Sequence, residues 1–457
     1  MLFERPQAGR RAVILHIELE REPNPDLGEF CELARSAELE LVDSISAPRR
    51  APHPHTFVGS GKVQQIKDCL KRSHADLLLV NHEVSPGQQR NLERALDCSV
   101  VSRTELILTI FAARARSHEG QLQVELAQMK HAQTRLVRGW THLDRQKGGI
   151  GMRGAGEKQI ELDQRMLSDR IKVLEHKLSE VHKRRAQNRR GRDRRGTPTV
   201  ALVGYTNAGK STLFNKLTHA DVYAEDQLFA TLDPTMRKLE IAGLNDVVLV
   251  DTVGFVSALP HALVEAFKAT LEEVVYADLL LHVVDGADPL VLERVQQVRT
   301  VLAEIGVYEA SEGHKPAQEL LVINKTDQLS DSQVALLKQE LSVGEVVAAD
   351  STAPDTSCGT TTGLCAVSAL SGDGLSDLSD TIGAALGVVA PHEVLLDPAD
   401  GKTRAWLYRS GAVLSEQATE DGTLSLLLQA NDHVIGRLRN QPGVSLRQCS
   451  TVPKISP

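Results

Sequence analysis

The sequence predicts an α/β protein in which a P-loop domain follows a small α/β domain and a long two-helix hairpin and precedes a small α+β domain. Three observations support this fold class. A glycine-rich phosphate-loop pattern lies between an apolar run and a helical stretch. Shorter apolar runs near the N-terminus alternate with helical segments, as in α/β domains. A long charged segment of helical character separates these two regions, and 457 residues suffice for several domains of the usual size.

The first domain is expected over residues 1–110. Its apolar runs include residues 13–15 and 77–80, which have the composition of buried strands. Helix-like stretches around residues 27–38, 63–72 and 88–96 lie between and after these runs. The alternation predicts a parallel or mixed sheet covered by helices.

Residues 111–196 are expected to form a helical hairpin. Apolar side chains recur at helical spacing in each half and predict two packed helices. The helices would be joined by the loop Gly148–Gly156, whose nine residues include five glycines. A plain interhelical turn is the alternative, but such turns need roughly 2–8 residues. The recurring apolar residues are Leu122, Leu126 and Met129, then Leu167, Ile171, Leu174 and Leu178.

The charge is distributed unevenly between this hairpin and the rest of the chain. The whole chain carries −8, which argues against a nucleic-acid partner, but residues 112–195 hold 21 Lys and Arg against 10 Asp and Glu. This segment therefore carries +11 and the remainder −19. Residues 183–195 alone contain eight cations, which suit a phosphate backbone; a solvated helix end is the alternative. Arg153, beside Arg145, Lys147 and Lys158, would favour close approach of the loop to structured RNA.

Residues 197–388 are expected to form the nucleotide-binding domain, beginning with the buried strand 199–203. Within it, residues 351–363 have the composition of a mobile surface loop. Residues 389–457 are expected to form the α+β domain, with strands at Arg404–Tyr408 and Thr423–Leu428. No apolar run reaches the roughly 20 residues of a membrane span, and the N-terminal sequence lacks the layout of a signal peptide. We expect a cytoplasmic, monomeric protein.

The segment Gly204–Ser211 matches the phosphate-loop pattern in its required context, after a strand and before the helical stretch 212–217. Its glycines allow backbone N–H groups to surround an anion, and the following helix N-terminus adds partial positive charge. Lys210 is expected to reach the terminal phosphates, and the Ser211 hydroxyl to bind Mg²⁺. The residues expected to contact nucleotide here are Gly204, Tyr205, Thr206, Asn207, Ala208, Gly209, Lys210, Ser211 and Thr212.

A second strand, residues 247–250, ends 41 residues after Lys210 in Asp251-Thr252-Val253-Gly254. This order places the Asp251 carboxylate near the expected metal ion, and it places Gly254 where its N–H can face the γ-phosphate. Phe255 follows in place of a glutamine. A phenyl ring cannot orient the attacking water, so we expect slow intrinsic hydrolysis.

A third strand leads into Asn324-Lys325-Thr326-Asp327, which indicates guanine recognition. The Asp327 carboxylate can accept hydrogen bonds from guanine N1–H and its exocyclic amine, whereas adenine would leave the charge unpaired. Ser368-Ala369-Leu370 would supply a backbone N–H to guanine O6. The motifs together predict GTP and GDP as ligands.

A switch segment is expected between the phosphate loop and Asp251. It comprises Phe229, Ala230, Thr231, Leu232 and Asp233, and would become ordered when γ-phosphate and Mg²⁺ are present. We favour Thr231 over Thr235 as the second metal ligand beside Ser211. Lys210, Thr231 and Gly254 are the residues expected to act in catalysis.

Two further hypotheses concern cations and a second site. Asn207 resembles the asparagine with which some GTPases hold K⁺ beside the phosphates, although Asn is equally a turn residue. The segment Gly59–Lys62 looks like another phosphate loop, but Val63 follows the lysine, and Thr56 occupies the place of the first glycine. A strand-to-helix turn is favoured there. A second, ATP-binding site is the alternative, as in an RNA-unwinding ATPase that uses Lys62.

The chain resembles the HflX family of ribosome-associated GTPases over roughly residues 10–390. The resemblance is carried by GYTNAGKSTLFN, FATLDPT and DTVGF, and more distinctively by HEGQLQVELAQ and LVRGWTHLDRQKGGIGMRG, although Ala155 replaces a proline usual in the family. It implies GTP-dependent binding to the large ribosomal subunit through residues 112–195 and the glycine loop. It also implies dissociation of stalled or stressed ribosomes, with hydrolysis stimulated by the ribosome. The competing hypothesis is a regulatory switch that binds a protein effector without touching RNA.

Overall fold

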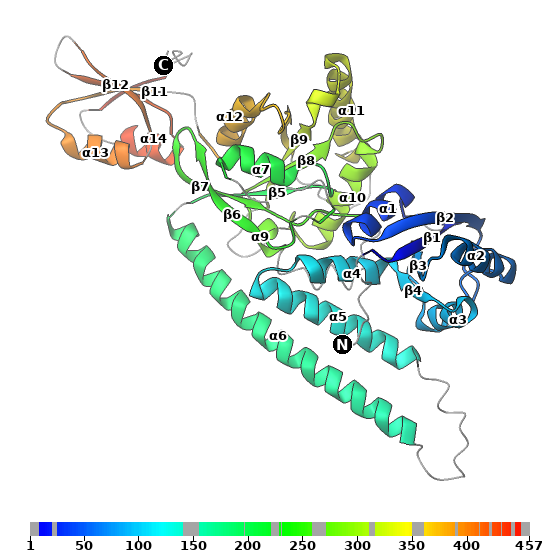
Figure 1. Cartoon of the computed structure of the whole chain (residues 1–457). Helices are drawn as coiled ribbons and strands as arrows, with labels where there is room; N and C mark the ends of the chain where they lie inside the picture. Colours follow the sequence, from blue (N-terminus) through cyan, green and yellow to red (C-terminus); the bar gives the residue numbers. More distant parts are fainter. Residues whose placement is uncertain are drawn as a thin grey trace. The chain divides into compact units, whose positions relative to one another are not determined.

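The computed structural model describes residues 9–20, 25–139, 155–195, 197–220, 228–229, 231–257, 271–309, 316–349, 361–388, 392–410, 412–419, 423–430, 432–439 and 444–448 (Figure 1). All structural statements below concern these residues. None of the described helices has the length and apolar composition needed to cross a membrane.

The N-terminal part forms a four-stranded parallel sheet in the order β2-β1-β3-β4, as the alternation of apolar and helical segments predicts. Strand β3 is fully buried because helices cover the sheet, and this explains its uninterrupted apolar sequence. The elements are β1 (Arg11–Leu19), α1 (Leu27–Ser36), β2 (Glu40–Arg49), α2 (Ser60–Ser73), β3 (Leu77–Val80), α3 (Pro86–Leu96), β4 (Ser99–Ser102) and α4 (Arg103–Arg114).

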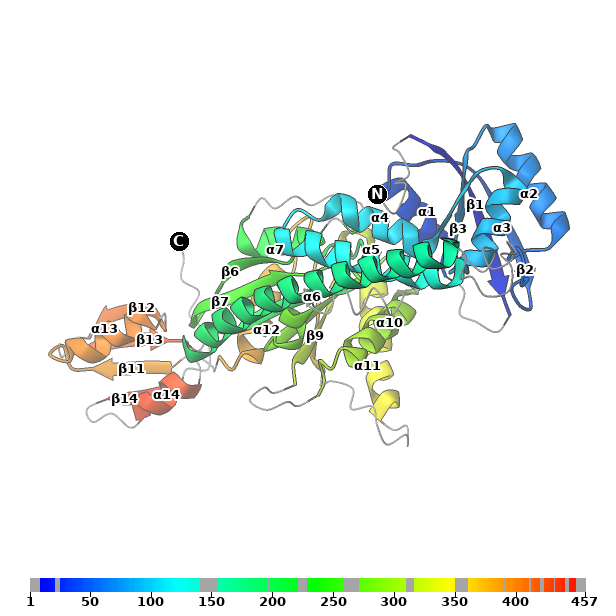
Figure 2. The same cartoon turned by 90° about the horizontal axis from the view of Figure 1, so that it is seen from below.

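Two long helices follow, α5 (His118–Gly139) and α6 (Ala155–Arg195), and both views show them running side by side (Figures 1 and 2). Their contact is the apolar seam expected from the sequence: Leu122, Leu126 and Met129 pack against Ile171, Leu174 and Leu178. Ion pairs between Lys130 and Glu175 and between Arg170 and Glu125 flank this seam. Of the glycine loop, residues 148–154 lie outside the described part of the chain.

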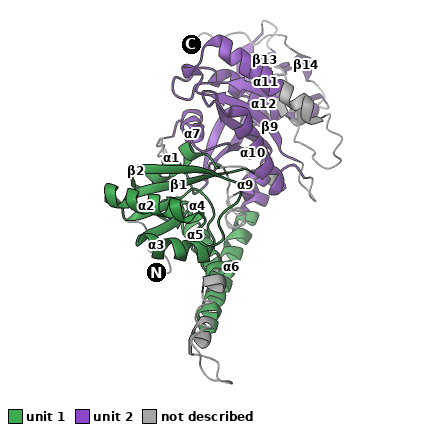
Figure 3. Ribbon diagram, turned by 90° about the vertical axis from the view of Figure 1, so that its right-hand side faces the viewer, with its two compact units in different colours: residues 1–187, 225–233, 255–269 green, residues 188–224, 234–254, 270–457 purple. Residues whose placement is uncertain are grey.

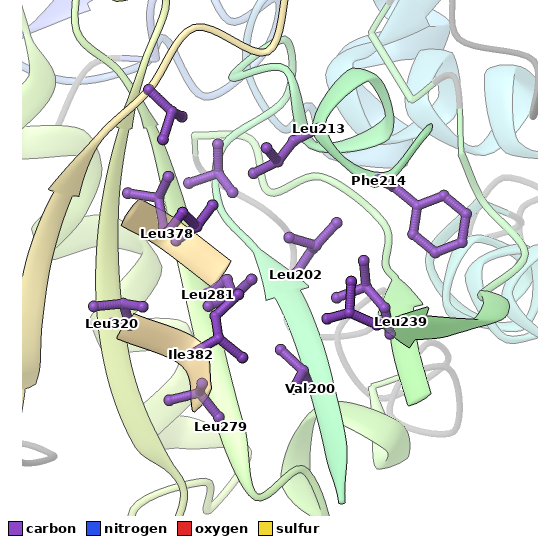
Figure 4. Close-up of a cluster of buried hydrophobic side chains, with 14 of the residues drawn as sticks. Val200, Leu202, Leu213, Phe214, Leu239, Leu279, Leu281, Leu320, Leu378 and Ile382 are labelled. Atoms are coloured by element: carbon purple, nitrogen blue, oxygen red, sulfur yellow. The ribbon is translucent and has the colours of Figure 1, made fainter. Parts of the chain in front are cut away.

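The nucleotide-binding domain has a six-stranded sheet in the order β10-β9-β8-β5-β7-β6, in which β6 is antiparallel to β7 and the other pairs are parallel. Figure 4 shows side chains of its central strands packing against α7 and α12. The elements are β5 (Thr199–Val203), α7 (Lys210–Thr218), β6 (Thr235–Ile241), β7 (Leu244–Asp251), α9 (Glu272–Val275), β8 (Leu279–Asp285), α10 (Val291–Glu304), β9 (Gln318–Asn324), η2 (Thr326–Gln328), α11 (Asp331–Ala349), β10 (Thr361–Ala366) and α12 (Leu375–Ala385).

One boundary of the expected surface loop at residues 351–363 is wrong. Residues 361–363 belong to β10, which pairs with β9. Their Thr and Gly composition resembles a loop, but the backbone hydrogen bonds of an edge strand do not depend on apolar side chains.

The C-terminal domain has an antiparallel sheet in the order β12-β13-β11-β14, and its described residues also include the helices α13 and α14. The strand expected at Arg404–Tyr408 is instead part of a helix, α13, which begins where the Asp400 carboxylate accepts a hydrogen bond from the Thr403 amide. Thr403 and Leu407 are buried four residues apart, which is helical spacing. The elements are β11 (His392–Leu396), α13 (Gly401–Arg409), β12 (Val413–Ala418), β13 (Leu424–Leu428), α14 (Asp432–Arg439) and β14 (Ser445–Gln448).

By internal contacts the chain divides into two units that do not follow the sequence order. Residues 1–187 form one unit together with 225–233 and 255–269, and the other residues form the second (Figure 3). The described residues of the switch segments, 228–229, 231–233 and 255–257, therefore group with the N-terminal part and the helices rather than with the phosphate loop.

Candidate nucleotide-binding site

The phosphate loop connects β5 to α7 and requires glycine at both ends. Gly204 has φ +143° and Gly209 has φ +88°, a region that residues with a side chain rarely adopt. A Cβ atom on Gly204 would lie 2.1 Å from the Val283 carbonyl oxygen, and one on Gly209 would lie 2.2 Å from the Asn324 amide nitrogen. The loop can take this shape only because these side chains are missing.

Lys210 is the first residue of α7, and its ammonium group is already oriented. Its Nζ donates hydrogen bonds to the carbonyl oxygens of Gly204, at 3.1 Å, and Tyr205, at 2.7 Å. An ammonium group has three donor protons, so one remains for a phosphate oxygen. Burial lowers the pKa of Lys210 to about 8, although the nearby Asp251 carboxylate acts in the opposite direction.

Ser211 and Asp251 lie together at the expected metal position. The Ser211 hydroxyl donates a 2.7 Å hydrogen bond to Asp251 Oδ2, and Asp251 is fully buried at the end of β7. A hydroxyl and a carboxylate are oxygen ligands of the kind that Mg²⁺ prefers. These residues fit such an ion, which would neutralise phosphate charge when bound.

Gly254 lies against the phosphate loop. A Cβ atom there would be 2.8 Å from Thr206 Cγ2 and 2.9 Å from Lys210 Nζ, so a larger residue would displace the segment. Between Asp251 and Gly254, the Thr252 hydroxyl donates to the Leu202 carbonyl, and Val253 is buried. The amide of Gly254 is thus held close to the lysine that is expected to bind the terminal phosphates.

The guanine motifs from two distant segments are hydrogen-bonded to each other. Asn324 Nδ2 donates to the Ala208 carbonyl at 2.8 Å, and the Ala369 amide donates to Asn324 Oδ1 at 2.9 Å. Asn324 therefore joins the phosphate loop to the segment Ser368–Leu370. The Ser368 hydroxyl donates to Asp327 Oδ1 at 2.6 Å, while the Asp327 side chain remains exposed for a base. Leu370 is 73% exposed beside them.

Two residues near the site were not anticipated from the sequence. Asp285, at the end of β8, pairs with Lys325 at 2.7 Å and thereby fixes the lysine that follows Asn324. Arg294 on α10 donates a 2.8 Å hydrogen bond to the Tyr205 hydroxyl, and its guanidinium lies 4.3 Å from the centre of the Tyr205 ring. Asp285 could have been predicted from the sequence, because it lies at the end of an apolar strand. No local sequence pattern distinguishes Arg294.

The switch residues make contacts within their own unit. Phe229 and Leu232 are buried, and the Phe229 ring packs edge-on against Phe111, with 4.5 Å between ring centres. The Asp233 carboxylate accepts hydrogen bonds from the amide and hydroxyl of Ser117, both at 2.6 Å, at the start of α5. Asp233 therefore bonds a helix N-terminus in this structure. Ala230 lies outside the described residues.

The basic run at the end of α6 divides into two sets. Arg185, Arg189 and Arg192, spaced four and three residues apart on one helix face, pair with Glu119, Glu272 and Glu273 respectively. Lys183, Arg184 and Arg190 are exposed. Fewer of these cations are therefore available to a phosphate backbone than the sequence suggested, because one helix face is used for ion pairs.

The second phosphate-loop-like segment is a turn into a helix. Gly59 immediately precedes α2, and a Cβ atom there would lie 2.8 Å from the Arg49 guanidinium. The Lys62 ammonium lies 3.4 Å from the Ser46 carbonyl oxygen. Both contacts involve β2, so they connect the start of α2 to the neighbouring strand.

Four family models match consecutive parts of the chain. Those described as GTP-binding GTPase N-terminal and GTP-binding GTPase Middle Region match residues 24–112 and 114–192. Those described as 50S ribosome-binding GTPase and HflX C-terminal domain match residues 199–325 and 356–447. The last match corrects the expectation that the family likeness ends near residue 390.

Two relatives match this chain over nearly the whole length of both proteins. The GTPase HflX of Escherichia coli (strain K12) is 47% identical over 427 residues, which cover 93% of this chain and 94% of that protein. The GTPase HflX of Magnetococcus marinus is 42% identical over 447 residues, covering 96% and 97%. Among solved structures, a complex of SsGBP with GDP is 25% identical, covers 82% of this chain and 98% of that one, and has a TM-score of 0.47.

Proposed function

Since the chain belongs to the HflX family of GTPases, we propose that this GTPase binds the large ribosomal subunit in its GTP state and dissociates stalled or stressed ribosomes. Ribosome binding would stimulate hydrolysis of GTP to GDP and phosphate. The observation that carries the proposal is the match of residues 199–325 to a 50S ribosome-binding GTPase model, in a domain whose phosphate and guanine motifs are hydrogen-bonded together.

The helical hairpin is the proposed RNA-binding part. Lys183, Arg184 and Arg190 are exposed cations on α6, and the glycine loop, which connects α5 to α6 in the sequence, has few side chains. Cations attract phosphate without reading sequence, and glycine permits close approach of the backbone to a partner. A protein that binds ribosomes in this way would act in the cytoplasm.

Ions complete the proposed catalytic site. Mg²⁺ would bind between the phosphates and the Ser211 hydroxyl, with Thr231 as the second protein ligand when the switch segment closes. K⁺ beside Asn207 is a further proposal. Asn207 has φ +60°, which also fits its alternative role as a turn residue. Equal GTP turnover in potassium and sodium buffers would exclude the K⁺ site.

Sedimentation of purified ribosomes with this protein and a non-hydrolysable GTP analogue tests the proposal. We expect 70S particles to convert into subunits, with the protein in the large-subunit fraction, and no conversion with GDP. If the 70S particles stay intact with the GTP analogue and the protein does not sediment with the large subunit, the proposal is wrong. An effector-binding switch is the competing function, and the salt dependence of binding separates the two, because affinity through phosphate neutralisation falls steeply with salt.

A further inference from the structure

A buried charged cluster lies where the sheet of the nucleotide-binding domain packs against α10. Side chains alternate between the two faces of the sheet along β8 and β9. Leu281 and Leu320 belong to the core that includes α7 and α12 (Figure 4). His282 and Glu319 are their neighbours in sequence and therefore face the other side, where β8 and β9 pack with α10. Glu319 is fully buried and His282 is 1% exposed, so both need hydrogen-bond partners within the protein.

Both carboxylate oxygens of Glu319 accept hydrogen bonds from other elements. His282 Nδ1 donates to Oε1 at 2.7 Å, and Arg299 Nε on α10 lies 3.1 Å from Oε1 and 3.2 Å from Oε2. The Tyr308 hydroxyl, which follows α10, donates to Oε2 at 3.3 Å. Burial by itself raises the pKa of Glu319, but the hydrogen bonds and charges of His282 and Arg299 outweigh it and hold this pKa below its ordinary value. Glu319 is therefore ionised.

Such a cluster fixes the position of a helix more than it adds to stability. A buried ion pair is often no more stabilising than apolar residues of the same volume, because the loss of hydration offsets the attraction. Its hydrogen bonds are directional, however, whereas the apolar contacts of α10 through Val291 and Val295 are not. Arg299 therefore determines where α10 lies along β8 and β9.

The same helix reaches the phosphate loop through a second arginine. Arg294 lies five residues before Arg299, about 7.5 Å along the helix axis. It donates a 2.8 Å hydrogen bond to the Tyr205 hydroxyl, and its guanidinium lies 4.3 Å from the centre of the Tyr205 ring. Asp288, before the start of α10, pairs with Arg294 at 3.4 Å and orients it locally. The Tyr205 carbonyl accepts the 2.7 Å hydrogen bond from Lys210, so a shift of α10 would reach the lysine that binds phosphate.

We propose that Glu319 and Arg299 are positioning residues for nucleotide binding, because they hold α10 where Arg294 supports Tyr205 and the phosphate loop. These residues all lie in the same compact unit. Glu319 and Arg299 act on the nucleotide only through Arg294. Since the phosphate loop binds the phosphates that GTP and GDP share, loosening α10 should weaken the binding of both nucleotides.

The test is a double-mutant cycle in the full-length protein without ribosomes, so its outcome does not depend on the proposed action on ribosomes. GDP affinity is measured for wild type, Glu319→Gln, Arg294→Gln and the protein with both changes. Glu319→Gln keeps the size of the side chain but removes its charge, and should lower GDP affinity by about three- to tenfold. In the Arg294→Gln background the same change should cause no further loss, because Arg294 is the group through which Glu319 acts.

Melting temperatures are measured in parallel, with Ile382→Val as the control. Ile382 is buried in the core that includes α12 and does not belong to the cluster that packs against α10. Its truncation should lower the melting temperature and leave GDP affinity unchanged, which separates loss of stability from loss of positioning. Arg299→Lys keeps a cation but loses the planar guanidinium, and should also lower GDP affinity. It takes the place of Glu319→Gln in the cycle if that variant does not fold.

Wild-type GDP affinity in folded Glu319→Gln and Arg299→Lys would overturn the proposal, and a lowered melting temperature alone would then show that the cluster serves only the stability of the domain. Losses of affinity that add in the doubly substituted protein would overturn it as well. Glu319 would in that case affect the nucleotide site independently of Arg294.

Discussion

The hydroxyl of Ser211 lies 2.7 Å from the carboxylate of Asp251, so that the start of α7 and the end of β7 are directly bonded. Removal of this hydroxyl by Ser211→Ala takes away one proposed metal ligand and the partner of a buried carboxylate. We expect the Mg²⁺ concentration for half-maximal GTP hydrolysis to rise by about tenfold or more. Ser211→Thr keeps the ligand and should behave as wild type. An unchanged Mg²⁺ requirement in Ser211→Ala would exclude Ser211 as a ligand.

Asp327→Asn should change the preferred base from guanine to xanthine. The amide can donate to the 2-oxo group of xanthine where the carboxylate accepted from the amine of guanine. We expect the ratio of GTP to XTP affinity to fall by about a hundredfold or more. Asp331→Asn, an exposed acid at the start of α11, serves as control. A variant that still prefers GTP would show that another residue reads the base.

Nucleotide binding should weaken above pH 8. The folded protein without nucleotide holds the pKa of Lys210 at about 8, below its ordinary value of 10.5, because the ammonium is buried. Between these values the unfolded chain binds a proton that the folded protein does not, so Lys210 adds stability to the nucleotide-free protein as pH rises through this window. Binding of the nucleotide phosphates requires the charged ammonium of Lys210. The affinity for nucleotide therefore falls over the same range of pH in which the nucleotide-free protein gains stability.

The affinity for GDP should therefore fall by up to about tenfold for each pH unit above 8. Calorimetric titrations between pH 7 and about 9.5 measure this change. Lys210→Met, which lacks a titrating amine, should bind weakly and without this dependence on pH. A wild-type affinity that stays constant to pH 9.5 would show that the ammonium remains charged in the free protein.

The contact between Arg294 and Tyr205 should support the phosphate loop from outside. Tyr205 also accepts the 2.7 Å hydrogen bond from Lys210 through its carbonyl, so its position affects the lysine. Arg294→Gln removes both the hydrogen bond and the stacking, and we expect GDP affinity to fall by about five- to thirtyfold, from about 1–2 kcal/mol. Tyr205→Phe keeps the ring and should have a smaller effect. If wild type, Arg294→Gln and Tyr205→Phe bind GDP with equal affinity, the contact between Arg294 and Tyr205 has no role in nucleotide binding.

Replacement of residues 148–156 by a short Gly-Ser linker tests the proposed action of the glycine loop on ribosomes. The loop joins α5 and α6, far in sequence from Lys210, and its flanking cations suit RNA. We expect intrinsic GTP hydrolysis within about twofold of wild type and loss of ribosome splitting. Gradient profiles and phosphate release are measured on one preparation. Normal splitting would make the loop a simple connector, and an equal loss of intrinsic hydrolysis would connect it to the nucleotide site.

The sequence by itself determined the elements whose requirements are local. Gly204 and Gly209 adopt backbone angles that require glycine, and Asp251 and Asn324 follow apolar strands, so spacing sufficed to identify them. The seam between α5 and α6 was likewise visible as helical periodicity. The helix at Arg404–Tyr408 was misassigned because an alternation of five residues is too short to distinguish a strand from a helix.

Only the tertiary structure decided which charges and hydroxyls are already bonded. Arg103 and Ser257 are separated by 154 residues, and Asp233 and Ser117 by 116, so no local pattern links them. In the same way, the sequence of α6 shows a run of cations, but only folding brings Glu119 and Glu273 against Arg185 and Arg192. A charge close to an opposite charge and one facing solvent have the same sequence signature. Their chemistry differs because electrostatic interaction depends on distance and burial, which arise when remote segments pack together.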